Sequence, residues 1–247
     1  MMHIVFSLFG FMGALALGLA NILVPMFALG PLPAERTQLG IAALVAAALL
    51  LTVPVALGAW PQAALLAAVG PALAAVVWHL HSMRQVMRQG MRRELGGSFR
   101  LVRLGWGGLI ATLALAAWWA LDPEWAGATT ALVACAAMVW LMSFLFGILQ
   151  RIVPFLVSMH LAGAGRRAPT PSGLTDERAL GVHRSGHVAA LVLTMLAIAI
   201  DSALVGYAAA MAGVVGALGF GVFFVVVLKR ARRARDDRAA GAVRAAR

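Results

Sequence analysis

Apolar residues along this chain gather in long runs that are separated by short polar stretches. Continuous runs of Leu, Ala and Val, without strand-like alternation, cover about residues 4–29, 39–58, 62–78, 104–121, 127–161, 187–204 and 208–228. A helix of this length can cross a hydrocarbon core about 30 Å thick. Because a helix satisfies its own backbone hydrogen bonds in lipid, the pattern predicts an all-α, polytopic membrane helical bundle of seven transmembrane helices.

Composition narrows the class further. Hydrophobic residues make up 62% of the 247 residues and charged residues 12%, and the mean hydropathy is +0.92, which excludes a water-soluble domain. The formal net charge of +11 does not indicate a nucleic-acid partner, because the basic residues flank the apolar runs and are not interleaved with aromatic residues on a soluble surface. The distribution of the basic residues therefore indicates which side of the membrane each loop faces.

Positive charge predicts the orientation. Residues 82–103, the loop after the fifth run and the tail hold eighteen of the twenty Lys and Arg, whereas Asp122, Glu124 and Asp201 lie near the opposite ends of the spans. The positive-inside rule places the N-terminus outside and the C-terminus in the cytoplasm, in a bacterial inner membrane. A six-span alternative turns the last two runs into a re-entrant pair.

Two basic segments are candidates for contact with the bilayer. Residues 1–228 are predicted to form the membrane domain, and 229–247 a basic cytoplasmic tail that is disordered or bound to lipid. If the loop 82–103 is helical, Arg84, Arg88 and Arg92 form a stripe suited to anionic headgroups at the cytoplasmic face.

A short pattern occurs twice. GLANILVP (18–25) and GILQRIVP (147–154) both follow G-x-x-(N/Q)-x-x-V-P, 129 residues apart and at the same end of an apolar run. Chance can produce two such octets in a chain rich in Gly and Val. The alternative is an internal repeat whose unit has about four helices, with Pro25 and Pro154 kinking their helices at one membrane depth.

The stretches that contain these octets carry a family resemblance. The pattern H-x6-GF-x6-G-x6-PMF from His3 to Phe27, and FGILQRIVPFLVSMH from Phe146 to His160, resemble the later membrane half of bacterial proteins distantly similar to subunit I of haem-copper oxidases. The resemblance implies a respiratory or electron-transfer setting and haem b as a cofactor. Its histidine pair and His-Pro-Glu motif are missing from the spans, so we do not expect a catalytic oxidase.

Five residues are candidate haem or propionate contacts. They are His3 at the outer edge, His79, His81 and His160 near the cytoplasmic edge, and Arg151 beside Pro154. Imidazole is the usual protein ligand of haem iron, but interfacial histidines are amphipathic anchors more often than ligands. Arg151 either reaches headgroups or meets a propionate or a carboxylate of a partner. His183 and His187, four residues apart, form a weaker pair.

Three functions remain open at this stage. The first is a non-catalytic haem-copper-oxidase-like subunit that associates with other membrane subunits of a respiratory or electron-transfer complex, with or without haem. The second is a small transporter or channel-like bundle. The third is an assembly or scaffold protein, because Gly10-x-x-Gly13 and Gly213-x-x-Gly216-x-x-Gly219 provide small-residue faces for close helix packing.

Overall fold

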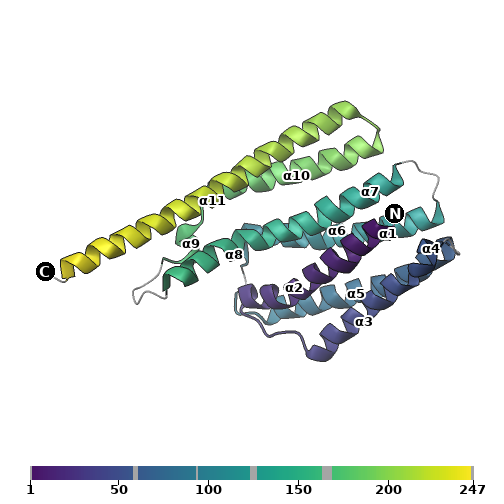
Figure 1. Cartoon of the computed structure of the whole chain (residues 1–247), viewed down its shortest axis with the longest axis horizontal. Helices are drawn as coiled ribbons and strands as arrows, with labels where there is room; N and C mark the ends of the chain where they lie inside the picture. Colours follow the sequence, from purple (N-terminus) through teal and green to yellow (C-terminus); the bar gives the residue numbers. More distant parts are fainter. Residues whose placement is uncertain (1, 58–60, 93, 123–126, 163–168, 246–247) are drawn as a thin grey trace. The chain divides into compact units, whose positions relative to one another are not determined.

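The computed structural model describes residues 2–57, 61–92, 94–122, 127–162 and 169–245, and every regular element in these ranges is helical (Figure 1). Among the described residues, seven helical stretches are long and apolar enough to cross a membrane. They are His3–Ala28, Glu35–Val55, Gln62–Gln89, Gly96–Leu121, Ala128–Ala162, Glu177–Ala199 and Ala203–Asp236. The all-α class and the seven membrane-length helices are thereby confirmed, and they are those of a multi-pass membrane protein.

The helical elements follow one another with few residues between them. In chain order they are α1 (Met2–Val5), η1 (Phe6–Gly13), α2 (Ala14–Ala28), α3 (Glu35–Leu51), α4 (Val53–Ala56), α5 (Pro61–Gln89), α6 (Gly96–Leu121), α7 (Ala128–Ala134), η2 (Cys135–Met142), α8 (Ser143–Ala162), α9 (Pro171–Leu174), α10 (Glu177–Ala199) and α11 (Ala203–Ala245). Here η marks a π-helical segment, and each of these two lies inside a membrane-length helix.

Helix α5 continues to Gln89, well past the predicted end at residue 78. Arg84 and Arg88 therefore lie in this helix, whereas the sequence predicted them in a loop. Met83 and Val86, on either side of Arg84 in the sequence, are buried, so the helix keeps an apolar face while its other face is basic. Arg92 does not join the stripe, because α5 ends at Gln89 and the Arg92 backbone N–H donates to the Ala28 carbonyl.

Two later boundaries also differ from the predictions. Helix α10 begins ten residues before the predicted start at 187, because Asp176 caps it by accepting hydrogen bonds from the backbone N–H groups of Arg178 and Ala179. Helix α11 continues through the tail to Ala245, so residue 228 marks a change of composition and not a helix end. Ala and Arg are good helix formers, which explains the helical backbone of residues 229–245. That the tail is disordered or bound to lipid stays a prediction.

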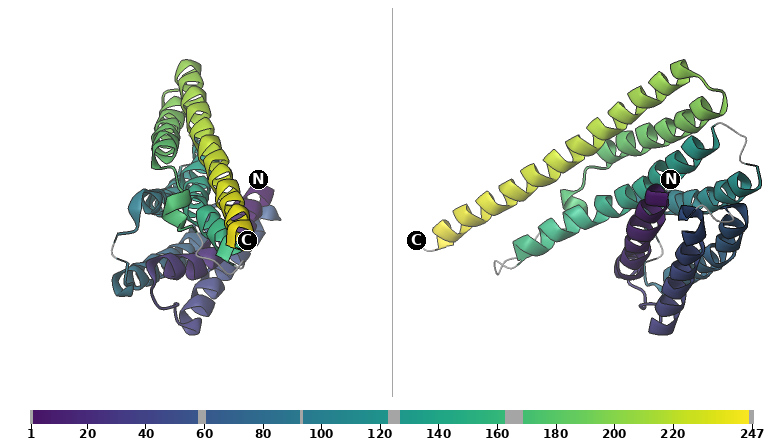
Figure 2. Two further views of the ribbon diagram at one scale, coloured as in Figure 1. Left: turned by 90° about the vertical axis from the view of Figure 1, so that its left-hand side faces the viewer. Right: turned by 45° about the vertical axis from the view of Figure 1, so that its right-hand side comes forward.

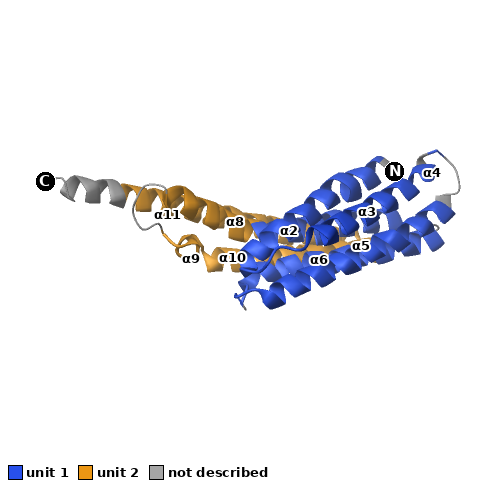
Figure 3. Ribbon diagram, turned by 90° about the horizontal axis from the view of Figure 1, so that it is seen from below, with its two compact units in different colours: residues 1–148 blue, residues 149–247 orange. Residues whose placement is uncertain are grey.

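The chain divides into two compact units, residues 1–148 and 149–247 (Figure 3). In the first unit α3 packs on α5, and α6 packs on α5 and η2. One part of its core is formed by Val76, Leu109, Leu113, Ala136, Trp140 and Leu141. Gly105 and Gly108 of α6 meet the backbone of η2 and the start of α8, where a Cβ on Gly108 would lie 2.7 Å from the Trp140 nitrogen.

The second unit is built on a close pair of helices, α10 and α11, which lie side by side in both views of Figure 2. A Cβ on Gly186 would lie 2.6 Å from the backbone nitrogen of Gly216, so glycine lets the two backbones touch. Leu174, Leu180, Phe223 and Val227 form the core of this unit, with Val153 and Val157 of α8 against it. Arg230 donates to the carbonyls of Gly173 and Thr175 and so joins α9 to α11.

The two π-helical segments stand in corresponding places. Phe6–Gly13 and Cys135–Met142 are both eight residues long and are offset by 129 residues, the offset of the two octets that follow them. Pro25 and Pro154 lie inside α2 and α8 at the same offset. The internal repeat is still a proposal, and this shared irregularity is a second correspondence in its favour.

Candidate functional site

The predicted histidines have different surroundings. His3, His81 and His160 are exposed; His3 lies 3.5 Å from the Ser7 hydroxyl and His81 lies 2.8 Å from the Gln85 amide nitrogen. His79 is fully buried. Two residues along a helix turn a side chain by about 200°, so His79 and His81 lie on opposite sides of α5. Among the described residues, no three His, Cys, Asp or Glu side chains come together as a metal site would need.

His79 stands out because both of its ring nitrogens lack a hydrogen-bond partner among the described residues. The buried Asn21 of α2 has an unpartnered side-chain oxygen as well. Helices α2 and α5 contact each other in this unit. Sequence reasoning missed Asn21 as a site residue, although it is a polar residue inside an apolar run.

Arg151 lies in α8 beside a polar connection between helices of the second unit. Arg151 itself is half-buried. Its buried neighbour Gln150 accepts a hydrogen bond from the Arg184 guanidinium at 3.3 Å, and the same guanidinium pairs with Glu177 at 3.1 Å. Half-burial is compatible with both interpretations of Arg151. Its contact with headgroups, or with a propionate or carboxylate, stays a prediction.

The weaker histidine pair is buried in the same unit. The ring centroids of His183 and His187 lie 5.9 Å apart with 17° between the ring planes. His183 Nδ1 lies 2.9 Å from the Gly216 carbonyl oxygen, and the His183 ring is 5.0 Å from Phe220. A donated Nδ1–H fixes the orientation of the imidazole. These contacts make His183 part of the α10–α11 packing.

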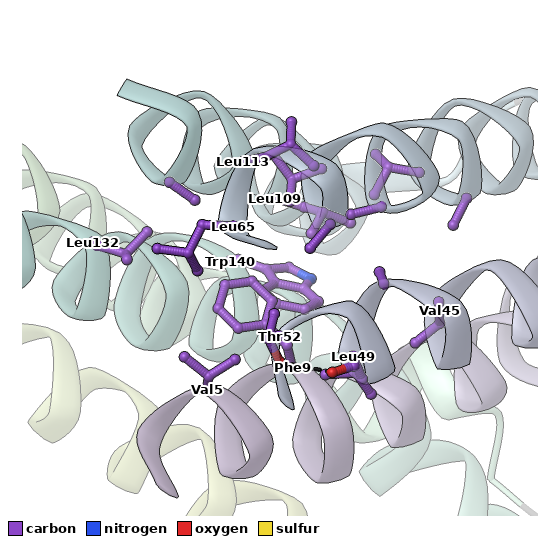
Figure 4. A pocket seen from close by; sticks show the side chains of 18 of the residues that line it. Val5, Phe9, Val45, Leu49, Thr52, Leu65, Leu109, Leu113, Leu132 and Trp140 are labelled. Atoms are coloured by element: carbon purple, nitrogen blue, oxygen red, sulfur yellow. Dashed lines mark hydrogen bonds between the residues drawn. The ribbon is translucent and has the colours of Figure 1, made fainter. Parts of the chain in front are cut away.

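An apolar cavity of about 130 Å³ lies in the first unit, where the two π-helical segments approach each other (Figure 4). Phe9 and Trp140 line it with ring centroids 5.7 Å apart, and Leu49, Leu109 and Leu113 are further lining residues. Thr52 also lines the cavity, but its hydroxyl donates to the Leu49 carbonyl at 2.7 Å. Such a cavity accepts an apolar group and offers little to a charged one.

A second hollow lies on the surface of the same unit, between α5 and α6. Its volume is about 630 Å³, and it combines three arginines with apolar side chains. Arg84 and Arg88 come from α5, and Arg103 comes from α6. We call this hollow the basic groove.

No family model, no curated protein and no solved structure matches this chain. The resemblance to haem-copper oxidase subunit I therefore rests on the residues of the first and fifth membrane-length helices.

Proposed function

We propose that this protein is a non-catalytic integral membrane subunit that binds another membrane subunit by helix contact. The observation that carries the proposal is a second small-residue face on α11. Gly206, Ala210, Ala217 and Gly221 fall within about 60° of one another around the helix, at 100° per residue. The two alanines and Gly221 are exposed, and a Cβ on either glycine would meet no atom within 4 Å.

The first small-residue face of α11 explains why this second face matters. Gly216 and Gly219 belong to the small-residue face that the sequence predicts. Both pack against α10 within the same chain. Membrane helices associate through van der Waals packing, and small residues allow their backbones to approach closely. The face from Gly206 to Gly221 has the same chemistry and is open. The large exposed side chains Tyr207, Leu218 and Leu204 lie about 70°, 90° and 130° around the helix from the centre of this face, and so leave the face itself uncovered.

The resemblance supports a choice of partner class. We propose another membrane subunit of a respiratory or electron-transfer complex as the partner, because the stretches around GLANILVP and GILQRIVP resemble proteins of that setting. Haem b stays a prediction, and no hollow described above supports it. His79 is the buried histidine of the predicted set in the first unit, and it lines neither the apolar cavity nor the basic groove. The proposal therefore includes no step through haem.

Photo-crosslinking in the native membrane tests the contact. A photoreactive phenylalanine analogue at position 217 should give an adduct heavier than the chain alone, and mass spectrometry should identify a second membrane protein in it. The same analogue at Ala208, an exposed position about 180° around α11 from Ala217, is the matched control and should label lipid. Equal labelling from both positions, or an adduct that stays within the chain, would contradict the proposal.

A packing variant gives an independent measurement. Ala217→Leu should lower the amount of partner that co-purifies in mild detergent, because the added side chain holds the helices apart, whereas Ala208→Leu should leave it unchanged. The absorption spectrum of the same wild-type preparation also tests haem. A b-type haem would show a Soret band and a reduced α-band, and these bands would confirm the haem prediction.

A further inference from the structure

The basic groove has a polarity along the helix axes. Arg84, Arg88 and Arg103 line the half nearer the connection between α5 and α6. Leu80 and Ile110 line the half farther from that connection, because α5 runs toward it and α6 runs away from it. One end of the groove is therefore cationic and the other apolar.

No described carboxylate neutralises the positive charge at the cationic end of the groove. The three arginines are exposed, and none pairs with a carboxylate among the described residues. Arg84 and Arg88 are four residues apart on one helix, where like charges destabilise each other. A phosphate group could accept bidentate hydrogen bonds from these guanidiniums and remove the repulsion.

The apolar end of the groove is open and has room for a lipid acyl chain. Gly107 lies in the groove wall, and a Cβ there would meet no atom within 4 Å. Trp106 beside it is nearly buried, whereas Ile110 is 49% exposed. A glycine between these two residues leaves a shallow channel that continues from the arginines along α6. A free phosphate would use only the cationic end, whereas a lipid would fill both.

We propose that the basic groove binds one anionic diacyl phospholipid, with its phosphate among Arg84, Arg88 and Arg103 and one acyl chain along Leu80, Gly107 and Ile110. The site is separate from the small-residue face of α11 and does not depend on the proposed partner contact. By the predicted orientation it faces the cytoplasmic leaflet, where anionic lipids are available to basic residues.

Native mass spectrometry of the purified, delipidated full chain tests the site. Phosphatidylglycerol should bind as a single retained molecule, and phosphatidylcholine with the same acyl chains should be retained less. Arg103→Gln should weaken retention of phosphatidylglycerol roughly fivefold, the expected effect of one basic residue near a charged lipid. Arg100→Gln, which removes an exposed arginine of α6 outside the groove, is the matched control and should have no effect.

Two further measurements separate the lipid from other occupants. Gly107→Leu should block the channel and lower retention of phosphatidylglycerol without lowering the thermal unfolding temperature, because the position is open. Glycerol phosphate, the headgroup without acyl chains, should not displace the lipid at equal concentration. Equal losses in Arg103→Gln and Arg100→Gln, equal retention of the two lipids, or displacement by glycerol phosphate would each overturn the proposal.

Discussion

A buried imidazole without partners is costly at the scale of a single residue. His79 is fully buried, and neither ring nitrogen has a hydrogen-bond partner among the described residues. An unsatisfied buried polar group costs about 1–3 kcal/mol, whereas an apolar side chain of similar size carries no such cost. His79→Leu should therefore raise the free energy of unfolding by about that amount.

Thermal unfolding in detergent measures this difference. His81→Leu is the control on the same helix, because His81 is exposed and contacts Gln85, and it should change the unfolding temperature little. A clear loss of stability in His79→Leu alone would mean that the imidazole has a partner in the purified protein, such as a water molecule or a cofactor.

Close backbone contact is the property that matters at the scale of the helix pair. The Cβ of an alanine at position 186 would lie 2.6 Å from the Gly216 nitrogen, which is backbone and cannot rotate away. Gly186→Ala should separate α10 from α11 and lower the free energy of unfolding by about 1–3 kcal/mol, the usual cost of overpacking.

The control for this variant lies on the same helix. Position 181 is open, so Gly181→Ala should leave stability unchanged or raise it by up to about 1 kcal/mol through helix propensity. Chemical denaturation in mixed micelles, followed by circular dichroism, compares the two variants. A Gly186→Ala protein as stable as the wild type would show that α10 and α11 are packed less closely than described.

The helices themselves were the easiest part of the structure to predict from the sequence, because the length of an apolar run alone determines whether a helix can span a membrane. The ends of the helices were harder to predict. Met83 and Val86 continue the apolar face of α5 past Arg84, and a hydropathy average does not detect a helix whose other face is basic. The groove was missed for a related reason. Arg84 and Arg88 were recognised as a stripe, but Arg103 joins them only because α6 packs antiparallel to α5.

Topology is the testable property at the scale of the whole molecule. If each of the seven membrane-length helices crosses the bilayer, the two ends of the chain lie on opposite sides, and the basic segments predict a cytoplasmic C-terminus. Reporter fusions after Leu121 and after Leu228 should report opposite compartments, with the second in the cytoplasm. Activity of both reporters on one side would mean that an even number of the three membrane-length helices between them crosses the bilayer, and would refute the seven-span topology.

The length of α11 determines how far its positive charges lie from the membrane surface. A straight helix carries Arg235 about 10 Å beyond Leu228, at about 1.5 Å per residue. Salt at physiological strength screens a charged surface over about 8 Å. Arg230, closer to the membrane, is already engaged with the carbonyls of Gly173 and Thr175. With Leu228 at the membrane surface and α11 upright, Arg235 therefore lies beyond the screening length of the bilayer.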